Sequence, residues 1–509
     1  MSSSHSVTSV VADSITGKVL VSVEEPVETE FAYPPKASAN PSSRVWMQTD
    51  LHDNSLPIPS SFAYSMPERT RRFSSNVRVG TKAELVSSTP VNATQDDIAL
   101  INSAEQIARF RRTGMIQFAT LCWCLYLEGW NDGTTGPLLP VIQRDFGVGF
   151  AVVSMLFVSN CIGFISGAAA NVWLDDRFGF GKVPLLTTWV GAVCQLATYV
   201  IQAPRPPFPI MVLANFFAGF GLSLQNSQAN GFVGVLKENV PLKLGLLHAS
   251  YGLGAFSAPL VSTQFSEMRH WSYHYIISAG MAVSNIFLLI ATFRFKRQDD
   301  LLAEAGQETA EVTVHEENKY KQIFGIKSVH LLAIFALIYI GVEVTLGGWI
   351  VTFIINERDG GPSAGYISSG FFGGLTLGRV GLLWFNKLVG ERRVLFVYGI
   401  LAIILEITIW VVPSIIQNAV AVSFIGVLLG PMFPIIINYA SHIFPRWLLT
   451  ACVGWITGIG MAGSAALPFI TGLLASRYGI GSLQPLMVSM MCTMVGVWAL
   501  VPSVQRRAD

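Results

Sequence analysis

The chain has 509 residues, of which 51% are hydrophobic and only 13% charged, and its formal net charge is +1. Soluble domains average about 25% charged residues, so this composition indicates a membrane protein. The near-neutral charge argues against a nucleic-acid partner, which would select for a basic excess. All six cysteines fall inside apolar runs without metal-ligand spacing, so we expect no metal and no cofactor.

The first 105 residues differ in character from the rest. They are rich in Ser, Thr, Pro and Asn and show no sustained apolar periodicity, which predicts a disordered cytoplasmic N-terminal tail over residues 1–105. Within it, "RTRRFSSN" (69–76) is a basic-directed phosphorylation site or simply a solvated charge cluster. The start of the chain lacks a basic region followed by a long apolar stretch, so we expect no cleavable signal peptide.

Twelve apolar runs follow, and a helix needs about 20 such residues to cross a bilayer. They predict an all-α membrane protein with twelve transmembrane helices in two pseudo-symmetric six-helix bundles. The bundles are expected at 106–295 and 328–503, with a cytoplasmic central loop at 296–327 and a C-terminal tail at 504–509. The expected spans are 113–138, 150–173, 183–203, 209–235, 242–265, 272–295, 328–356, 364–387, 392–413, 415–441, 449–475 and 480–501.

Basic residues are distributed unequally between the two sides of this layout. One side has only Arg144, Arg205, Arg269, Arg358 and Arg477, and most other lysines and arginines fall on the opposite side. Because basic loops stay in the cytoplasm, both termini are predicted to be cytoplasmic. No retention signal is evident, so we expect a multi-pass protein of the plasma membrane.

The first span contains "CLYLEGWNDGTTGPLLP" (122–138), which places two carboxyl groups in an apolar helix. An ionisable group near the bilayer centre costs about 2.5–3.5 kcal/mol, so it needs a partner or a wet cavity. Glu128 and Asp132 are four residues apart and share one helix face with Asn131. Like charges this close disfavour double ionisation, which predicts that the pair takes up and releases a proton. Alternatively, Asp132 lies at the hydrated outer mouth.

The fourth span carries four amides in "SLQNSQANGF". Amides donate and accept hydrogen bonds, as the binding of hydroxyl-rich solutes requires. We therefore predict substrate-cavity roles for Gln225, Asn226, Gln228 and Asn230, with Asn131. The alternative is interhelical hydrogen bonding, which is worth about 0.6 kcal/mol per bond.

The second half carries its own polar positions. Glu343 lies midway along "YIGVEVTLGGWIVTF" and is a third proton-coupling candidate, with an ion pair or hydrogen bond inside the second bundle as its alternative. Arg379 is expected to be buried and paired with a carboxylate or with helix-end carbonyls, in a structural or gating role. Pro431 and Pro434 should kink span ten. The remaining substrate-cavity candidates are Tyr251, Trp349 and Asn438.

Two six-span halves with a basic loop after the second span of each resemble the major facilitator superfamily. Residues 172–182, "VWLDDRFGFGK", match the loop pattern of that family at Asp176, Arg177, Gly179 and Lys182. The resemblance implies the major facilitator fold and a loop that pairs with a neighbouring helix to stabilise one conformation. The gating or structural candidates are Asp176, Arg177, Lys182 and Arg379, together with Arg392 and Arg393 of "NKLVGERR" (386–393).

Further segments look like the fucose:proton symporter-like branch and the fungal "bypass of stop codon" membrane proteins. They are "GWNDGTTGPLLPVIQ", "LHASYGLGAFSAPL", "YIGVEVTLGGWIVTF", "GGLTLGRVGL" and "GPMFPIIIN", and the resemblance covers roughly residues 110–503. In the symporter branch, acidic residues of spans one and four serve substrate and proton coupling. Here span four offers amides where an acid is expected.

The sequence therefore predicts a proton-coupled symporter of a small polar organic solute, such as a sugar, working by alternating access. The alternatives are a proton-driven efflux antiporter of amphipathic compounds and a transport-inactive membrane sensor. In "GLGAFSAPL", Ala258 replaces the glycine of the G-P dipeptide of efflux members, which weighs against efflux. No motif for hydrolysis, zinc or ATP binding is present, so we expect no enzyme. The expected partners of a monomer are the lipid bilayer, the solute and protons.

Overall fold

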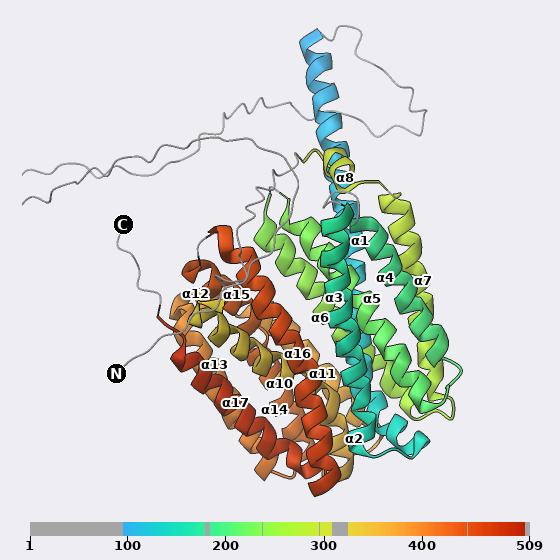
Figure 1. The fold of residues 1–509 in the computed structure, drawn as a ribbon, viewed down its shortest axis with the longest axis vertical. Coiled ribbons are helices and arrows are strands. Elements are labelled where there is room, and N and C mark those ends of the chain that lie inside the picture. The colour runs from blue at the N-terminus through green and yellow to red at the C-terminus, as the bar shows by residue number, and fades with distance from the viewer. Residues whose placement is uncertain are drawn as a thin grey trace, which may run out of the picture. The chain divides into compact units, whose positions relative to one another are not determined.

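The computed structural model describes residues 95–178, 184–236, 238–294, 296–307, 324–444 and 446–503. Their regular secondary structure is helical throughout (Figure 1). The predicted tail lies outside the described residues up to position 94. The ends of the helices near residues 144–154, 266–274, 357–366 and 478–483 share the side expected to face outward, and we call it the outer end.

The first half contains seven α-helices. They are α1 (Gln95–Phe146), α2 (Phe150–Val153), α3 (Met155–Phe178), α4 (Pro184–Gln202), α5 (Phe208–Gly234), α6 (Val240–Ser266) and α7 (His274–Phe293). A short helix, α8 (Gln298–Glu304), follows in the central loop. The second half contains α10 (Lys327–Glu357), α11 (Tyr366–Gly381), α12 (Leu383–Val389), α13 (Glu391–Val411), α14 (Ile415–Leu429), α15 (Met432–Ile443), α16 (Arg446–Tyr478) and α17 (Leu483–Leu500).

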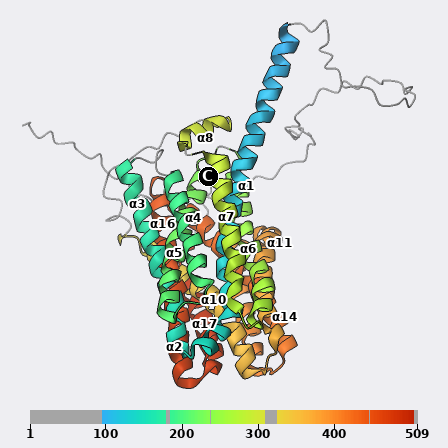
Figure 2. The same ribbon diagram turned by 90° about the vertical axis from the view of Figure 1, so that its right-hand side faces the viewer.

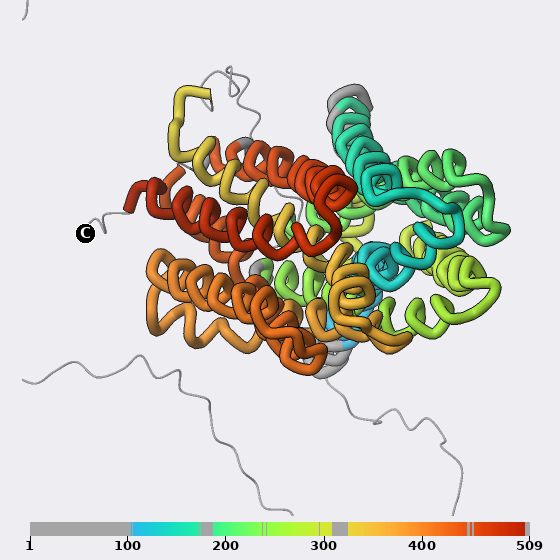
Figure 3. The backbone as a smooth tube through the Cα atoms, turned by 90° about the horizontal axis from the view of Figure 1, so that it is seen from below, coloured from blue at the N-terminus to red at the C-terminus, as the bar shows by residue number. Residues whose placement is uncertain are grey.

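The two halves repeat one packing pattern. In the first, α1 packs on α6, α3 on α5, and α4 on both α5 and α7. In the second, α10 packs on α16, α11 on α14, and α13 on both α14 and α17. Figure 3 shows the helices of each half grouped on their own side. The predicted fold of two pseudo-equivalent six-helix bundles is confirmed.

Nine helices of the described chain are long and apolar enough to cross a membrane, judged by length and composition. The other three helices at equivalent packing positions are α1, α4 and α11. The first carries the two carboxyl groups of the opening motif, the second contains buried glutamines, and the third is 16 residues long. Tertiary packing assigns all three helices to the bundles.

Glycine allows the closest helix contact in the first half. A Cβ atom at Gly129 of α1 would overlap the carbonyl oxygen of Tyr251 on α6, and one at Gly254 of α6 would overlap the carbonyl oxygen of Tyr126. The two backbones therefore touch, as small residues permit between helices in lipid. This contact positions the polar face of α1 against α6.

Three boundaries differ from the sequence prediction. Helix α1 begins at Gln95, so residues 95–105 are helical and not part of a disordered tail. They contain good helix formers and continue an established helix without the cost of a new nucleus. Helix α8 lies in the predicted central loop, where Leu301 and Leu302 are buried and Gln117 donates to the Leu301 carbonyl at 3.0 Å. Figure 2 shows α8 near the end of α7 and beside α1, which extends beyond it.

The third difference concerns the spans expected at 364–387 and 415–441. The first ends as α11 at Gly381 and continues as the separate helix α12. The second is interrupted between α14 and α15, at Gly430 and Pro431. The interruption confirms the predicted kink, because a proline removes a backbone donor from the helix ladder.

Candidate functional site

Glu128 lies at the centre of the first bundle, on α1, and is 8% exposed. The Nδ2 atom of Asn226, on α5, donates to both of its carboxylate oxygens at 2.8 Å. Asn230 donates in turn to the Asn226 side-chain oxygen at 2.8 Å and to its carbonyl at 2.9 Å. The carboxyl group therefore faces a polar helix in the protein interior, and two of the four predicted amides hold it in place.

Asp132 lies one turn further along α1 and is half-buried. It accepts a hydrogen bond from the Tyr251 hydroxyl at 2.9 Å and a long one from Asn131 Nδ2 at 3.3 Å. The Asn131 oxygen accepts from the Tyr199 hydroxyl at 3.4 Å. Asn131 is also half-buried, so the two neighbouring side chains border open space while tied to α4 and α6.

Gln225 belongs to a buried network and does not line a cavity. It is 2% exposed, donates to Gln195 Oε1 at 3.2 Å and accepts from Asn285 Nδ2 at 2.7 Å. Gln228 is 8% exposed and donates to Asn171 Oδ1. These two amides join α5 to α3, α4 and α7, which is the interhelical bonding stated as the alternative to substrate contact. A buried amide needs such partners, since an unpaired one is costly.

In the second half, Glu343 of α10 pairs with Arg379 of α11, with 3.5 Å between Oε1 and Nη2. Arg379 also reaches the first half. Its Nη1 atom is 3.5 Å from the His248 carbonyl, and its Cζ atom lies 5.6 Å from the centre of the Tyr251 ring. The predicted pairing of Arg379 with a carboxylate is confirmed, and the ion-pair alternative for Glu343 is what the structure shows.

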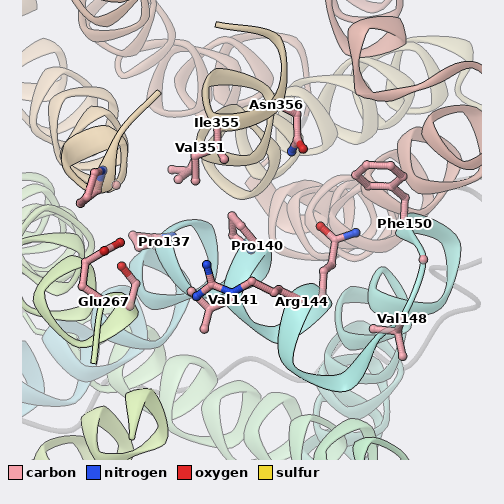
Figure 4. A pocket seen from close by; sticks show the side chains of 15 residues that line it. Pro137, Pro140, Val141, Arg144, Val148, Phe150, Glu267, Val351, Ile355 and Asn356 are labelled. Atoms are coloured by element: carbon pink, nitrogen blue, oxygen red, sulfur yellow. The ribbon is translucent and has the colours of Figure 1, made fainter. Parts of the chain in front are cut away.

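An outer pocket of about 430 Å³ separates the ends of α1 and α10. Figure 4 shows Pro137 and Pro140 of α1 facing Val351 and Ile355 of α10 across it. Below the pocket the halves touch, since a Cβ atom at Gly136 would overlap the Gly347 carbonyl oxygen. This contact lies between the pocket and Asp132, one turn away, and closes the outer end at this level.

Two further cavity candidates, Trp349 and Asn438, lie away from the central acids in this conformation. Trp349 is fully buried, donates to the Pro468 carbonyl at 3.1 Å and packs against Phe150 and Phe157. Its large apolar ring therefore fills the contact between the halves. Asn438 of α15 is exposed and hydrogen-bonds Glu391 of α13.

The loop candidates are only partly described. Lys182 lies outside the described residues, and Asp176 and Arg177 are placed as backbone at the end of α3. In the second half, Arg392 donates to the Val501 carbonyl at 2.6 Å and to the Tyr439 hydroxyl at 3.3 Å. It therefore joins α13 to the end of α17. Arg393 is exposed.

Sequence reasoning missed one buried carboxyl. Glu406 of α13 is 0% exposed, and neither of its oxygens has a hydrogen-bond partner among the described residues. Gln484 of α17, the helix that packs on α13, is likewise 0% exposed, and its two polar side-chain atoms have no partner in the part of the chain that the structure describes. The signal for Glu406 was present in "LAIILEITIW" as a single acid within an apolar run.

The fold and the enclosed polar centre define a membrane transport protein built from two repeats. A sequence profile of the Major Facilitator Superfamily matches residues 121–450. The chain belongs to this superfamily.

Two relatives and one solved structure are similar to most of this chain. Bypass of stop codon protein 6 of Saccharomyces cerevisiae is 23% identical over 400 residues, which cover 74% of this chain and 80% of that protein. The glucose/mannose transporter GlcP of Bacillus subtilis is 23% identical over 372 residues, or 72% of this chain and 89% of that protein. The E. coli fucose:proton symporter has a TM-score of 0.56 at 14% identity, covering 76% of this chain and 99% of that one. The resemblance to the bypass of stop codon proteins is confirmed, and the resemblance to the fucose:proton symporter is confirmed for the fold.

Proposed function

We propose that the protein is a proton-coupled symporter of a small polar organic solute, with Glu128 and Asp132 as the proton-binding pair. The observation that carries this proposal is the position of Glu128: a carboxyl group 8% exposed at the centre of a transmembrane bundle, held by the Asn226 amide. Such a residue is costly in a membrane and usually serves an ion or substrate pathway.

The spacing of the two acids supports proton exchange. Glu128 and Asp132 lie one helical turn apart on α1, so binding a proton at either carboxyl relieves their mutual repulsion. Asp132 is half-buried and borders open space, whereas Glu128 is more enclosed. A proton would therefore reach Asp132 first. Proton exchange between Asp132 and Glu128 would link the space between the halves to the polar face of α5.

The closed outer end supports alternating access. The two repeats would rock about the central acids, opening the outer end at the Gly136–Gly347 contact and closing the inner end. The proposal includes cytoplasmic termini, as the distribution of basic residues predicts, and the plasma membrane, since no retention signal is evident.

The solute class follows from the half-buried polar groups beside the acids. Asn131, Asn226 and Tyr251 present amide and hydroxyl groups that both donate and accept hydrogen bonds, which suits a hydroxyl-rich solute. The similarity to a glucose/mannose transporter makes hexoses the first class to test.

The test is uptake of radiolabelled glucose and mannose, followed by a wider sugar panel, into proteoliposomes with an imposed pH gradient. Driven uptake should be abolished in Glu128→Gln, with solute exchange at equal pH retained. Glu238→Gln, an exposed acid between α5 and α6, is the matched control and should behave as the parent. Driven uptake that survives in both Glu128→Gln and Asp132→Asn would refute the proton role. Proton-driven export of amphipathic dyes without sugar uptake would establish the antiporter alternative.

A further inference from the structure

Tyr251 contacts charged groups from both halves of the protein. Its hydroxyl group donates to Asp132 Oδ2 of the first half at 2.9 Å. The face of the same ring lies 5.6 Å from the guanidinium carbon of Arg379 in the second half, within the range of a cation–π interaction. Arg379 is in turn paired with Glu343. One side chain therefore connects the acid of α1 to the ion pair of α10 and α11.

The backbone around Tyr251 is held on two sides. A Cβ atom at Gly129 of α1 would overlap the Tyr251 carbonyl oxygen, and one at Gly252 would overlap the Thr376 hydroxyl of α11. At this level α6 therefore lies in direct contact with one helix from each half. A change in the strength of the Tyr251 contact with Asp132 or with Arg379 therefore acts on the packing of α6 between α1 and α11.

We propose that Tyr251 is a positioning residue that transmits the protonation state of Asp132 to the Arg379–Glu343 pair, and so links proton binding to the closure of α6 against α11. The inference rests on the proposed proton coupling and names the residue that would carry it between the halves.

The physical argument concerns the hydrogen bond from the tyrosine. A bond to an ionised carboxylate is about twice as strong as a neutral one. With Asp132 ionised, the Tyr251 hydroxyl is held firmly, and the polarised ring attracts the guanidinium group of Arg379 more strongly. When Asp132 binds a proton, both effects weaken. The contact between α6 and α11 is then easier to open.

Other titratable groups surround Tyr251, and the experiment must distinguish their effects on the conformation from that of Asp132. The charged groups that act electrostatically on Tyr251 are Asp132, Glu128, Glu343 and Arg379. Tyr199 on α4 interacts with Asp132, Tyr339 on α10 with the ion pair, and His248 on α6 with Arg379. His248 is the main competitor, because an unperturbed histidine changes charge between pH 5 and 8.

The test measures the conformation of the protein without any solute. Spin labels are attached at Met268→Cys and Tyr478→Cys, two exposed positions at the outer ends of α6 and α16. The background is Cys492→Ser, which removes the exposed cysteine of the described chain. Pulsed electron resonance in lipid nanodiscs then gives the populations of the outer-closed and outer-open states across a pH series.

We expect the ratio of the two populations to change with pH in the parent. In Tyr251→Phe, which keeps the ring and removes the hydroxyl, the change in ratio should shrink about five- to tenfold, as loss of a contact of this type predicts. Tyr126→Phe is the matched control. The Tyr126 hydroxyl on α1 hydrogen-bonds the Ser257 hydroxyl on α6 at 2.6 Å, between the same two helices that the Tyr251–Asp132 bond joins, without touching an acid. Tyr126→Phe and His248→Gln should both respond to pH as the parent does.

Four results would overturn the inference. The first three are no pH response in the parent, a full response in Tyr251→Phe, and an equal loss in Tyr251→Phe and Tyr126→Phe. Loss of the response in His248→Gln alone would assign the sensor to the histidine and overturn it as well. The proposed function fails separately. A pH response that depends on Tyr251 but drives no solute in proteoliposomes would support the link and refute symport.

Discussion

Asn226 on α5 donates one side-chain amide to both carboxylate oxygens of Glu128 on α1, at 2.8 Å each. This relationship joins a predicted proton site to a predicted cavity amide, from positions 98 residues apart in the sequence. The carboxyl group of Glu128 is only 8% exposed inside a transmembrane bundle. A buried carboxyl needs hydrogen-bond donors, and the Asn226 amide supplies them. Asn226 thus makes the position of Glu128 possible.

Asn226→Leu should destabilise the protein, because the buried carboxyl loses its donor. An unsatisfied buried polar group costs about 1–3 kcal/mol, more if charged, and the free energy of unfolding should fall by that amount in chemical denaturation. Asn215→Leu is the matched control, since Asn215 lies on the same helix and donates only to the Met211 carbonyl of its own turn. Equal losses in the two variants would show that the Glu128 contact contributes nothing.

Two glycine substitutions should have opposite effects. Gly129→Ala inserts a methyl group against the backbone of α6, and overpacking of this kind costs about 1–3 kcal/mol. At Gly231 of α5 no atom lies within 4 Å of an added Cβ, so alanine should raise stability by about 1 kcal/mol through its higher helix propensity. Thermal unfolding and the monodisperse yield after purification measure both. A Gly129→Ala protein as stable as its parent would mean that α1 and α6 are less closely packed.

Gln225→Leu should lower stability without changing solute affinity. Gln225 is 2% exposed and bonds Gln195 and Asn285, and such interhelical bonds average about 0.6 kcal/mol with a maximum near 1.7. The KM for solute uptake should stay at the parent value. In Asn131→Ala, by contrast, the KM should rise, because Asn131 is half-buried beside the acids. A raised KM in Gln225→Leu would return this glutamine to the substrate site.

Glu406→Met should stabilise the protein. Both carboxyl oxygens of Glu406 are buried without a partner in the described structure, so replacing the group with an apolar one of similar size removes a cost of about 1–3 kcal/mol. Glu343→Met is the comparison, because it leaves Arg379 without its carboxylate and should destabilise by roughly 3 kcal/mol. Thermal unfolding of the two variants should therefore shift in opposite directions. A lower midpoint in Glu406→Met would reveal a partner for this carboxyl.

The architecture was predictable from the amino-acid sequence. Apolar runs of bilayer length, a polar segment between two sets of six, and the bias of basic residues each follow from the cost of placing polar or charged groups in lipid. That cost acts locally along the chain, so hydropathy identifies most of the membrane helices. The same reasoning found Glu128, Asp132, Glu343 and Arg379 as residues that need a partner or a cavity. It applied equally to Glu406, which was overlooked.

The partners of those residues were decided by the tertiary structure. That Glu343 pairs with Arg379, that Gln225 joins three helices and that Trp349 fills the contact between the halves all depend on how helices distant in sequence rotate and approach. A helical pattern places a side chain on a face but does not say which helix lies against that face. The close contacts at Gly129, Gly136 and Gly252 settle this by fixing the register between neighbours. The amino-acid sequence therefore determined which groups must be satisfied in the membrane, and packing determined which atoms satisfy them.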